Sequence, residues 1–150
     1  ALPILFYIIT LAWLILDQAS KYYVQTHMAL GQSIVVVPGL FHWTYILNHG
    51  AAFGILRDQR IFFLAIVVIL LVCLAYKYKE IAKGPSYLKL GTGLLLAGAL
   101  GNAIDRFVQD GVVDFFDFLI WPIFNVADIG IVIGIFLVAY YMIASDSEDE

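Results

Sequence analysis

Four apolar stretches, each about as long as a membrane-spanning helix, constrain the fold of this chain most. They cover about residues 3–23, 60–77, 88–106 and 125–144. A helix needs about 20 apolar residues to cross the hydrocarbon core of a bilayer. Only 13% of the residues are charged, whereas a soluble domain carries about 25%. The sequence therefore predicts a single integral membrane domain, mainly α-helical, with four transmembrane helices.

The composition also excludes several classes of protein. A hydrophobic content of 63% excludes a disordered chain. A net charge of -4, with eight Lys and Arg, argues against a nucleic-acid partner. The single cysteine, Cys73, lies in an apolar run, and no Cys or His spacing matches a zinc site. We expect neither a metal nor a cofactor.

The lysines predict the orientation of the chain in the membrane. Half of the Lys and Arg residues lie in the loop between the second and third stretches: Lys77, Lys79, Lys83 and Lys89. Such loops face the cytoplasm, so an even number of spans places both termini there. The acidic tail, 145–150, does not contradict this, because Asp and Glu influence topology little. Segments 24–60 and 106–123 should face the outside.

The first outer segment is typical of β-structure over about residues 30–58. Residues 33–47 are rich in β-branched and aromatic side chains and are interrupted by Pro38-Gly39. After that turn, Phe41, Trp43 and Tyr45 alternate with more polar residues. We expect a small extracytoplasmic β-cradle between the first and second helices.

Polar and ionisable residues collect at the outer ends of the spans, where they can converge on one site near the outer leaflet. An ionisable residue within a span is a functional candidate by default. The residues concerned are Asp17, Lys21, Asn102, Asp105, Arg106, Asn125 and Asp128, with Asp114 in the loop before the last span. Each Asn-x-x-Asp pair projects an amide and a carboxylate from one helix face.

Simpler interpretations exist for some of these residues. Asn125 can be the N-cap of the last helix, and Asp17 with Lys21 can be a snorkelling ion pair. Asp117 is most simply a solvated charge, although it competes with Asp114 for a catalytic role. The three histidines are weaker candidates: His49 can lie beside the site, whereas His27 and His42 fit the membrane interface.

Asp114 and Asp128 form the most informative couple, because both are flanked by apolar residues. Two carboxylates in a low-dielectric pocket share a proton. Such a dyad activates a water with its charged member and protonates the substrate with its neutral member. The sequence contains neither an HExxH motif nor a Gly-x-Ser-x-Gly elbow.

Five blocks of residues resemble bacterial lipoprotein signal peptidase (signal peptidase II), in the order seen in that family. The blocks lie at 17–21, 48–53, 101–106, 112–115 and 124–128. The resemblance covers nearly the whole chain, from about 3 to 144. Asp114 and Asp128 are 14 residues apart, a separation that looks short for the family.

This resemblance implies an aspartic endopeptidase of the bacterial cytoplasmic membrane. The family removes the signal peptide of prolipoproteins just before a diacylglyceryl-modified cysteine, and globomycin inhibits it. The catalytic pair would fall on Asp114 and Asp128, with residues about 48–58 as a lid. The supporting residues would be Asp17, Lys21, Asn48, Gly50, Asn102, Asp105, Arg106 and Asn125. We expect the chain to act as a monomer among membrane lipids.

Two other classes of function remain open from the residues alone. Clustered carboxylates also serve proton relays, so a small transporter or proton-conducting subunit is one alternative. Against it, the carboxylates do not form a ladder across the bilayer, and no inverted repeat is visible. The second alternative is a non-catalytic assembly protein whose polar cluster binds a partner helix.

Overall fold

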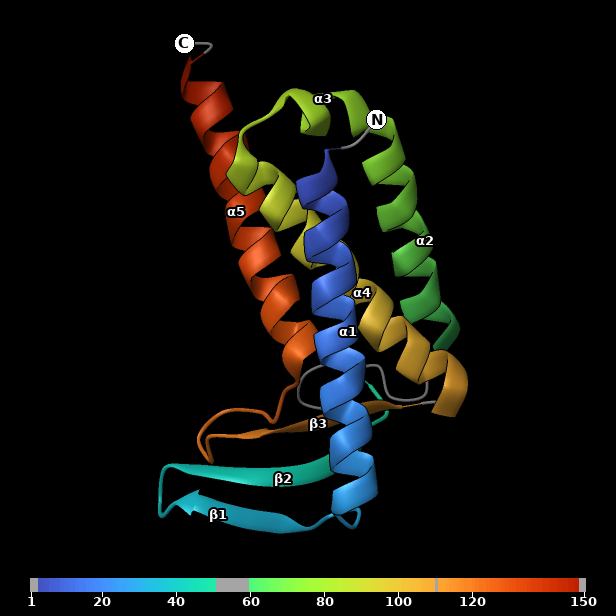
Figure 1. Cartoon of the computed structure of the whole chain (residues 1–150), viewed down its shortest axis with the longest axis vertical. Helices are drawn as coiled ribbons and strands as arrows, with labels where there is room; N and C mark the ends of the chain where they lie inside the picture. Colours follow the sequence, from blue (N-terminus) through green and yellow to red (C-terminus); the bar gives the residue numbers. More distant parts are fainter. Residues whose placement is uncertain (1–2, 51–59, 110, 149–150) are drawn as a thin grey trace.

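The computed structural model describes residues 3–50, 60–109 and 111–148, and in this part of the chain a helical bundle carries a small sheet across one end (Figure 1). The elements, in chain order, are α1 (Ile4–His27), β1 (Ser33–Val37), β2 (Phe41–Asn48), α2 (Arg60–Tyr76), α3 (Tyr78–Lys83), α4 (Ser86–Gln109), β3 (Val112–Asp117) and α5 (Val126–Glu148). Helix α1 begins and α5 ends at the opposite end of the bundle from the sheet, where α3 also lies (Figure 1).

Helices occupy all four apolar stretches of the sequence. Three of them, α1, α4 and α5, are long and apolar enough to cross a membrane by length and composition. Helix α2 is a shorter apolar helix of 17 residues. The described part of the chain is thus mainly helical, with three candidate spans and a three-stranded antiparallel sheet.

The bundle buries charge and exposes apolar side chains, the reverse of a soluble protein. Asp17 and Lys21 on α1 are 0% and 2% exposed, whereas Ile4 at the start of the same helix is 74% exposed. Helix α2 has no buried residue at all among its 17. An apolar exterior around an interior that contains charged residues is what a lipid environment allows.

Helix α4 is the central helix, and glycines let its neighbours approach it closely. It contacts α1, α2 and α5. A Cβ atom added at Gly98 would overlap the carbonyl oxygen of Ala127 on α5. One added at Gly101 would overlap the Asp17 carboxylate on α1. Small residues of this kind allow close helix packing in lipid, and here they draw polar groups of three helices together.

The sheet contains a strand that the sequence analysis did not predict. Strands β1 and β2 come from the first outer segment, as expected, but β3 comes from the second outer segment and pairs with β2. The register places Asp114 opposite Ile46 and Val113 opposite Leu47. The predicted cradle is therefore formed by both outer segments, because the apolar residues around Asp114 form a third strand that pairs with β2.

Two predicted boundaries remain: the start of the acidic tail and the end of the β segment and lid. Helix α5 continues to Glu148, so the first residues of the acidic tail are helical. No Gly or Pro interrupts residues 145–148, and the Ser147 hydroxyl donates to the Ala144 carbonyl at 2.9 Å. Residues 51–58 of the predicted β segment and lid lie outside the described residues.

Candidate functional site

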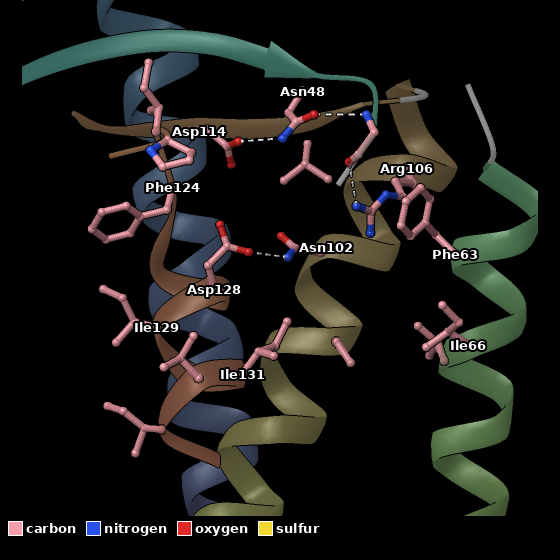
Figure 2. Close-up of a pocket in the computed structure, with 18 of the residues that line it drawn as sticks. Asn48, Phe63, Ile66, Asn102, Arg106, Asp114, Phe124, Asp128, Ile129 and Ile131 are labelled. Carbon is pink, nitrogen blue, oxygen red and sulfur yellow. Dashed lines mark hydrogen bonds between the residues drawn. The ribbon is translucent and has the colours of Figure 1, made fainter. Parts of the chain in front are cut away.

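Asp114 and Asp128 point into one cavity where the sheet meets the helices (Figure 2). The cavity has a volume of about 630 Å³, and its walls are largely apolar side chains of α2, α4 and α5. Asp114 comes from β3 and is 2% exposed, and Asp128 comes from the first turn of α5 and is half-buried. An apolar cavity with a few convergent polar groups is typical of a ligand site.

Asn125 caps α5 and fixes Asp128 at the same time. The Asp128 backbone N–H donates to Asn125 Oδ1 at 2.8 Å, and the Asn125 backbone N–H donates to Asp128 Oδ2 at 3.1 Å. This reciprocal pair has the geometry of a capping box. The N-cap interpretation of Asn125 is therefore correct, and it does not exclude a role in the site.

Two asparagine amides connect the two carboxylates. Asn125 Nδ2 donates to Asp114 Oδ1 at 2.7 Å, and Asn102 Nδ2 donates to Asp128 Oδ1 at 3.0 Å. Asn125 Nδ2 also lies 3.1 Å from Asn102 Oδ1. Each predicted Asn-x-x-Asp pair thus contributes one residue that holds a carboxylate of the cavity.

A buried ionic cluster lies behind these amides. Lys21 Nζ lies 2.8 Å from Asp17 Oδ2 and 3.0 Å from Asp105 Oδ2. The two carboxylates also accept backbone N–H groups from the elements that carry the cavity aspartates: Asp17 from Ala127 at 2.8 Å, and Asp105 from Val113 at 3.1 Å. The cluster thus fastens α5 and β3 to the bundle.

Lys21 also determines how the Asn102 amide is oriented. Its ammonium group donates to Asn102 Oδ1 at 3.1 Å. An ammonium group has no lone pair to accept a hydrogen bond, so the oxygen of the amide must face Lys21. The NH₂ group of Asn102 is then directed at Asp128 (Figure 2).

Three further predicted residues form the rim of the cavity. Asn48 Nδ2 lies 3.3 Å from Asp114 Oδ2, and Asn48 Oδ1 accepts the Gly50 backbone N–H at 2.9 Å. Arg106 Nη2 donates to the Gly50 carbonyl at 3.1 Å. The Arg106 guanidinium lies 4.0 Å from the ring centroid of Phe63 on α2. This cation–π contact joins the rim to α2.

Burial raises the pKa of Asp114 to about 8. The main cause is removal of the carboxyl group from water, and the neighbouring Asp128 carboxylate raises the pKa further. The hydrogen bonds from Asn48 and Asn125 oppose this shift without cancelling it. Asp114 therefore retains its proton at neutral pH.

The structure separates the other candidates from the two aspartates of the cavity. Asp117 accepts hydrogen bonds from Thr44 Oγ1 at 2.7 Å and from the Leu119 backbone N–H at 2.9 Å, which gives it a structural role in the sheet. His27 and His42 contact Tyr23 and Ser33 at exposed positions. None of these three residues lines the cavity of Asp114 and Asp128.

Two contributors were missed in the sequence. Gln18 Nε2 lies 3.0 Å from Asp17 Oδ2 and 3.2 Å from Asp105 Oδ1, so it bridges the ionic cluster. An amide inside an apolar stretch is a signal that could have identified it. Phe63, the partner of Arg106, carries no such signal, because it is one of many aromatic residues in an apolar helix.

Comparison with known proteins agrees with this geometry. Residues 9–144 match the family model described as signal peptidase (SPase) II. A lipoprotein signal peptidase of Halothermothrix orenii is 45% identical over 137 residues, which cover 91% of this chain and 93% of the relative. One of Listeria welshimeri is 40% identical over 146 residues, 94% of each chain.

A solved structure described as a bacterial membrane enzyme has a TM-score of 0.88 and 37% identity, and the match covers 97% of this chain and 91% of that one. The family resemblance of the five sequence blocks is therefore confirmed. The chain is a peptidase and belongs to the signal peptidase II family.

Proposed function

We propose that this chain removes the signal peptide of prolipoproteins by cutting immediately before the diacylglyceryl-modified cysteine, with Asp114 and Asp128 as the catalytic pair. The observation that carries the proposal is the shared cavity of the two carboxyl groups. Relatives named lipoprotein signal peptidase support the substrate class.

The surroundings of the two aspartates suggest different roles for them. The Asn125 backbone N–H and the Asn102 amide donate to the two oxygens of Asp128. Asp128 also lies at the N-terminus of α5, and the two hydrogen bonds and the helix N-terminus all favour a charged carboxylate. Asp128 is therefore the base that takes a proton from the attacking water. Asp114, which retains its proton, gives it to the leaving nitrogen as the C–N bond breaks.

The remaining predicted residues support the site without reacting. Asn48, Gly50 and Arg106 form a rim that can orient the substrate backbone. Asn102 and Asn125 hold the catalytic carboxyl groups, and the cluster of Asp17, Lys21 and Asp105 holds these amides and the backbone beside them. The apolar walls of the cavity suit acyl chains and a globomycin-type inhibitor.

We place the chain in the bacterial cytoplasmic membrane as a single integral domain over residues 1–150, with α1, α2, α4 and α5 as four spans. The lysine-bearing helix α3 lies at the same end of the bundle as the start of α1 and the end of α5 (Figure 1), which supports cytoplasmic termini. The site then lies near the outer leaflet. Because both aspartates come from one chain, a monomer suffices.

A cleavage assay tests the proposed function. We expect a diacylglyceryl-modified prolipoprotein to be cut in detergent so that the modified cysteine becomes the new N-terminus, with full activity in excess EDTA. Among the residues that the structure describes, no group of three or more His, Cys, Asp and Glu side chains is arranged to hold a metal ion. Strong inhibition by EDTA, or cleavage at another bond, would contradict the proposal.

The pKa of Asp114 predicts the alkaline limit of the activity. Below about pH 8 Asp114 holds the proton that it must donate, and above about pH 8 this proton is lost. We therefore expect kcat/KM to fall as the pH rises through about 8, by tenfold per pH unit well above it. A pH profile measured in nanodiscs checks this, with the exposed-acid variant Asp146→Asn as the control. A rate that stays constant to pH 10 would contradict the assigned role.

A further inference from the structure

A second cavity adjoins the first on the side of the sheet. It has a volume of about 730 Å³ and is lined by residues 46–50, Asp117 and residues 119–123. Five residues line both cavities: Asn48, Gly50, Trp121, Pro122 and Ile123. The two cavities therefore lie next to each other, and Asn48, which contacts the Asp114 carboxyl group, lines both.

The two cavities suit different parts of a substrate. The first cavity extends along the apolar helices α2, α4 and α5, where an apolar signal peptide would lie within the membrane. The second cavity is bounded by the end of β2 and by the loop after β3, outside the helices. The second cavity thus offers room for a chain that continues from the first cavity past the sheet.

We propose that the second cavity binds the first residues of the mature lipoprotein, downstream of the cleaved bond, and that Asp117 selects among them by charge. The proposal rests on the proposed function. Asp117 is the only Asp, Glu, Lys or Arg among the described residues that line this cavity. A carboxylate on an otherwise largely apolar wall favours basic residues and disfavours acidic ones.

The carboxylate of Asp117 is held in place rather than free to turn away. Its two oxygens accept hydrogen bonds from Thr44 Oγ1 at 2.7 Å and from the Leu119 backbone N–H at 2.9 Å. The second bond supports a turn in which Leu119 has a φ of 68°, a conformation that non-glycine residues seldom adopt. The loop that forms one wall of the cavity is thus fixed by the same residue that supplies the charge.

The test uses three lipid-modified prolipoprotein substrates that differ only in the two residues after the cysteine, which are Lys-Lys, Gln-Gln or Glu-Glu. The full chain is assayed in zwitterionic phosphatidylcholine nanodiscs, so that the bilayer adds no net charge. We expect kcat/KM for the Lys substrate to exceed that for the Glu substrate by about three- to tenfold, as for partly exposed ion pairs. The ratio should decrease toward one as the salt concentration rises.

Substitution then assigns the preference to Asp117. Asp117→Asn keeps a side chain that can accept from the Leu119 N–H and pair with Thr44, so the ratio should fall to about one. Glu80→Gln removes a charge from α3 at the other end of the bundle and should leave the ratio unchanged. Equal cleavage of the Lys and Glu substrates by the wild type, or an unchanged ratio in Asp117→Asn, would overturn the inference while leaving the proposed function intact. Failure to cleave any of the three substrates would overturn both.

Discussion

Replacing Asp114 or Asp128 by asparagine should abolish cleavage of a diacylglyceryl-modified prolipoprotein. Each change keeps the shape of the side chain and removes its ability to hold or release a proton. Without a base at 128 the attacking water is not deprotonated, and without an acid at 114 the leaving nitrogen is not protonated. Loss of either function should lower kcat by about 10²–10⁴-fold. The two losses should not be additive in the double variant, because the residues act as one unit.

The matched control for these variants is Asp146→Asn, which makes the same chemical change at an exposed position near the end of α5. It should cleave at the wild-type rate. Insertion into the membrane and thermal unfolding of all variants should be measured in parallel, so that loss of fold is separated from loss of chemistry. Cleavage at the normal rate by a folded Asp114→Asn or Asp128→Asn variant would overturn the catalytic assignment.

The grouping of the polar residues could be predicted because chain order and helix geometry determine it. The ends of the first and third apolar stretches and the start of the fourth belong to the same membrane face, so Asp17, Asp105 and Asp128 were expected together. The structure places all three in one network with Lys21 and Asn102. Apolar stretches and i, i+3 spacing are local signals, and local signals can be recognised in a single sequence.

The features that sequence analysis missed depend on contacts between distant residues. Strand β3 exists because Val113 pairs with Leu47 and Asp114 with Ile46, which lie 66 and 68 residues earlier in the chain. No local pattern indicates which hairpin a short apolar segment will join. The contact of Phe63 with Arg106 also joins residues far apart in the chain. It could not be predicted, because an aromatic residue in an apolar helix gives no indication of its partner.

Replacing Lys21 by methionine should destabilise the protein more than any change of an exposed charge. Lys21 is 2% exposed and pairs with two buried carboxyl groups, Asp17 and Asp105. Removing one partner of a buried ionic group costs about 3–5 kcal/mol, because the remaining charge is left without compensation. Cleavage should fall too, since no ammonium group would then fix the Asn102 amide toward Asp128.

Lys77→Met provides the matched control, because Lys77 pairs with Glu80 at 3.3 Å with both side chains about half exposed. An exposed pair of this kind contributes about 0–1 kcal/mol, so the free energy of unfolding should change little. The double variant Asp17→Asn/Lys21→Met should recover part of the stability lost in Lys21→Met, because it leaves one uncompensated carboxylate fewer in the cluster. If Lys21→Met lowered the free energy of unfolding no more than Lys77→Met, the ionic cluster would not be what fastens β3 and α5 to the bundle. The positions of Asp114 and Asp128 would then depend on the asparagine amides and the sheet alone.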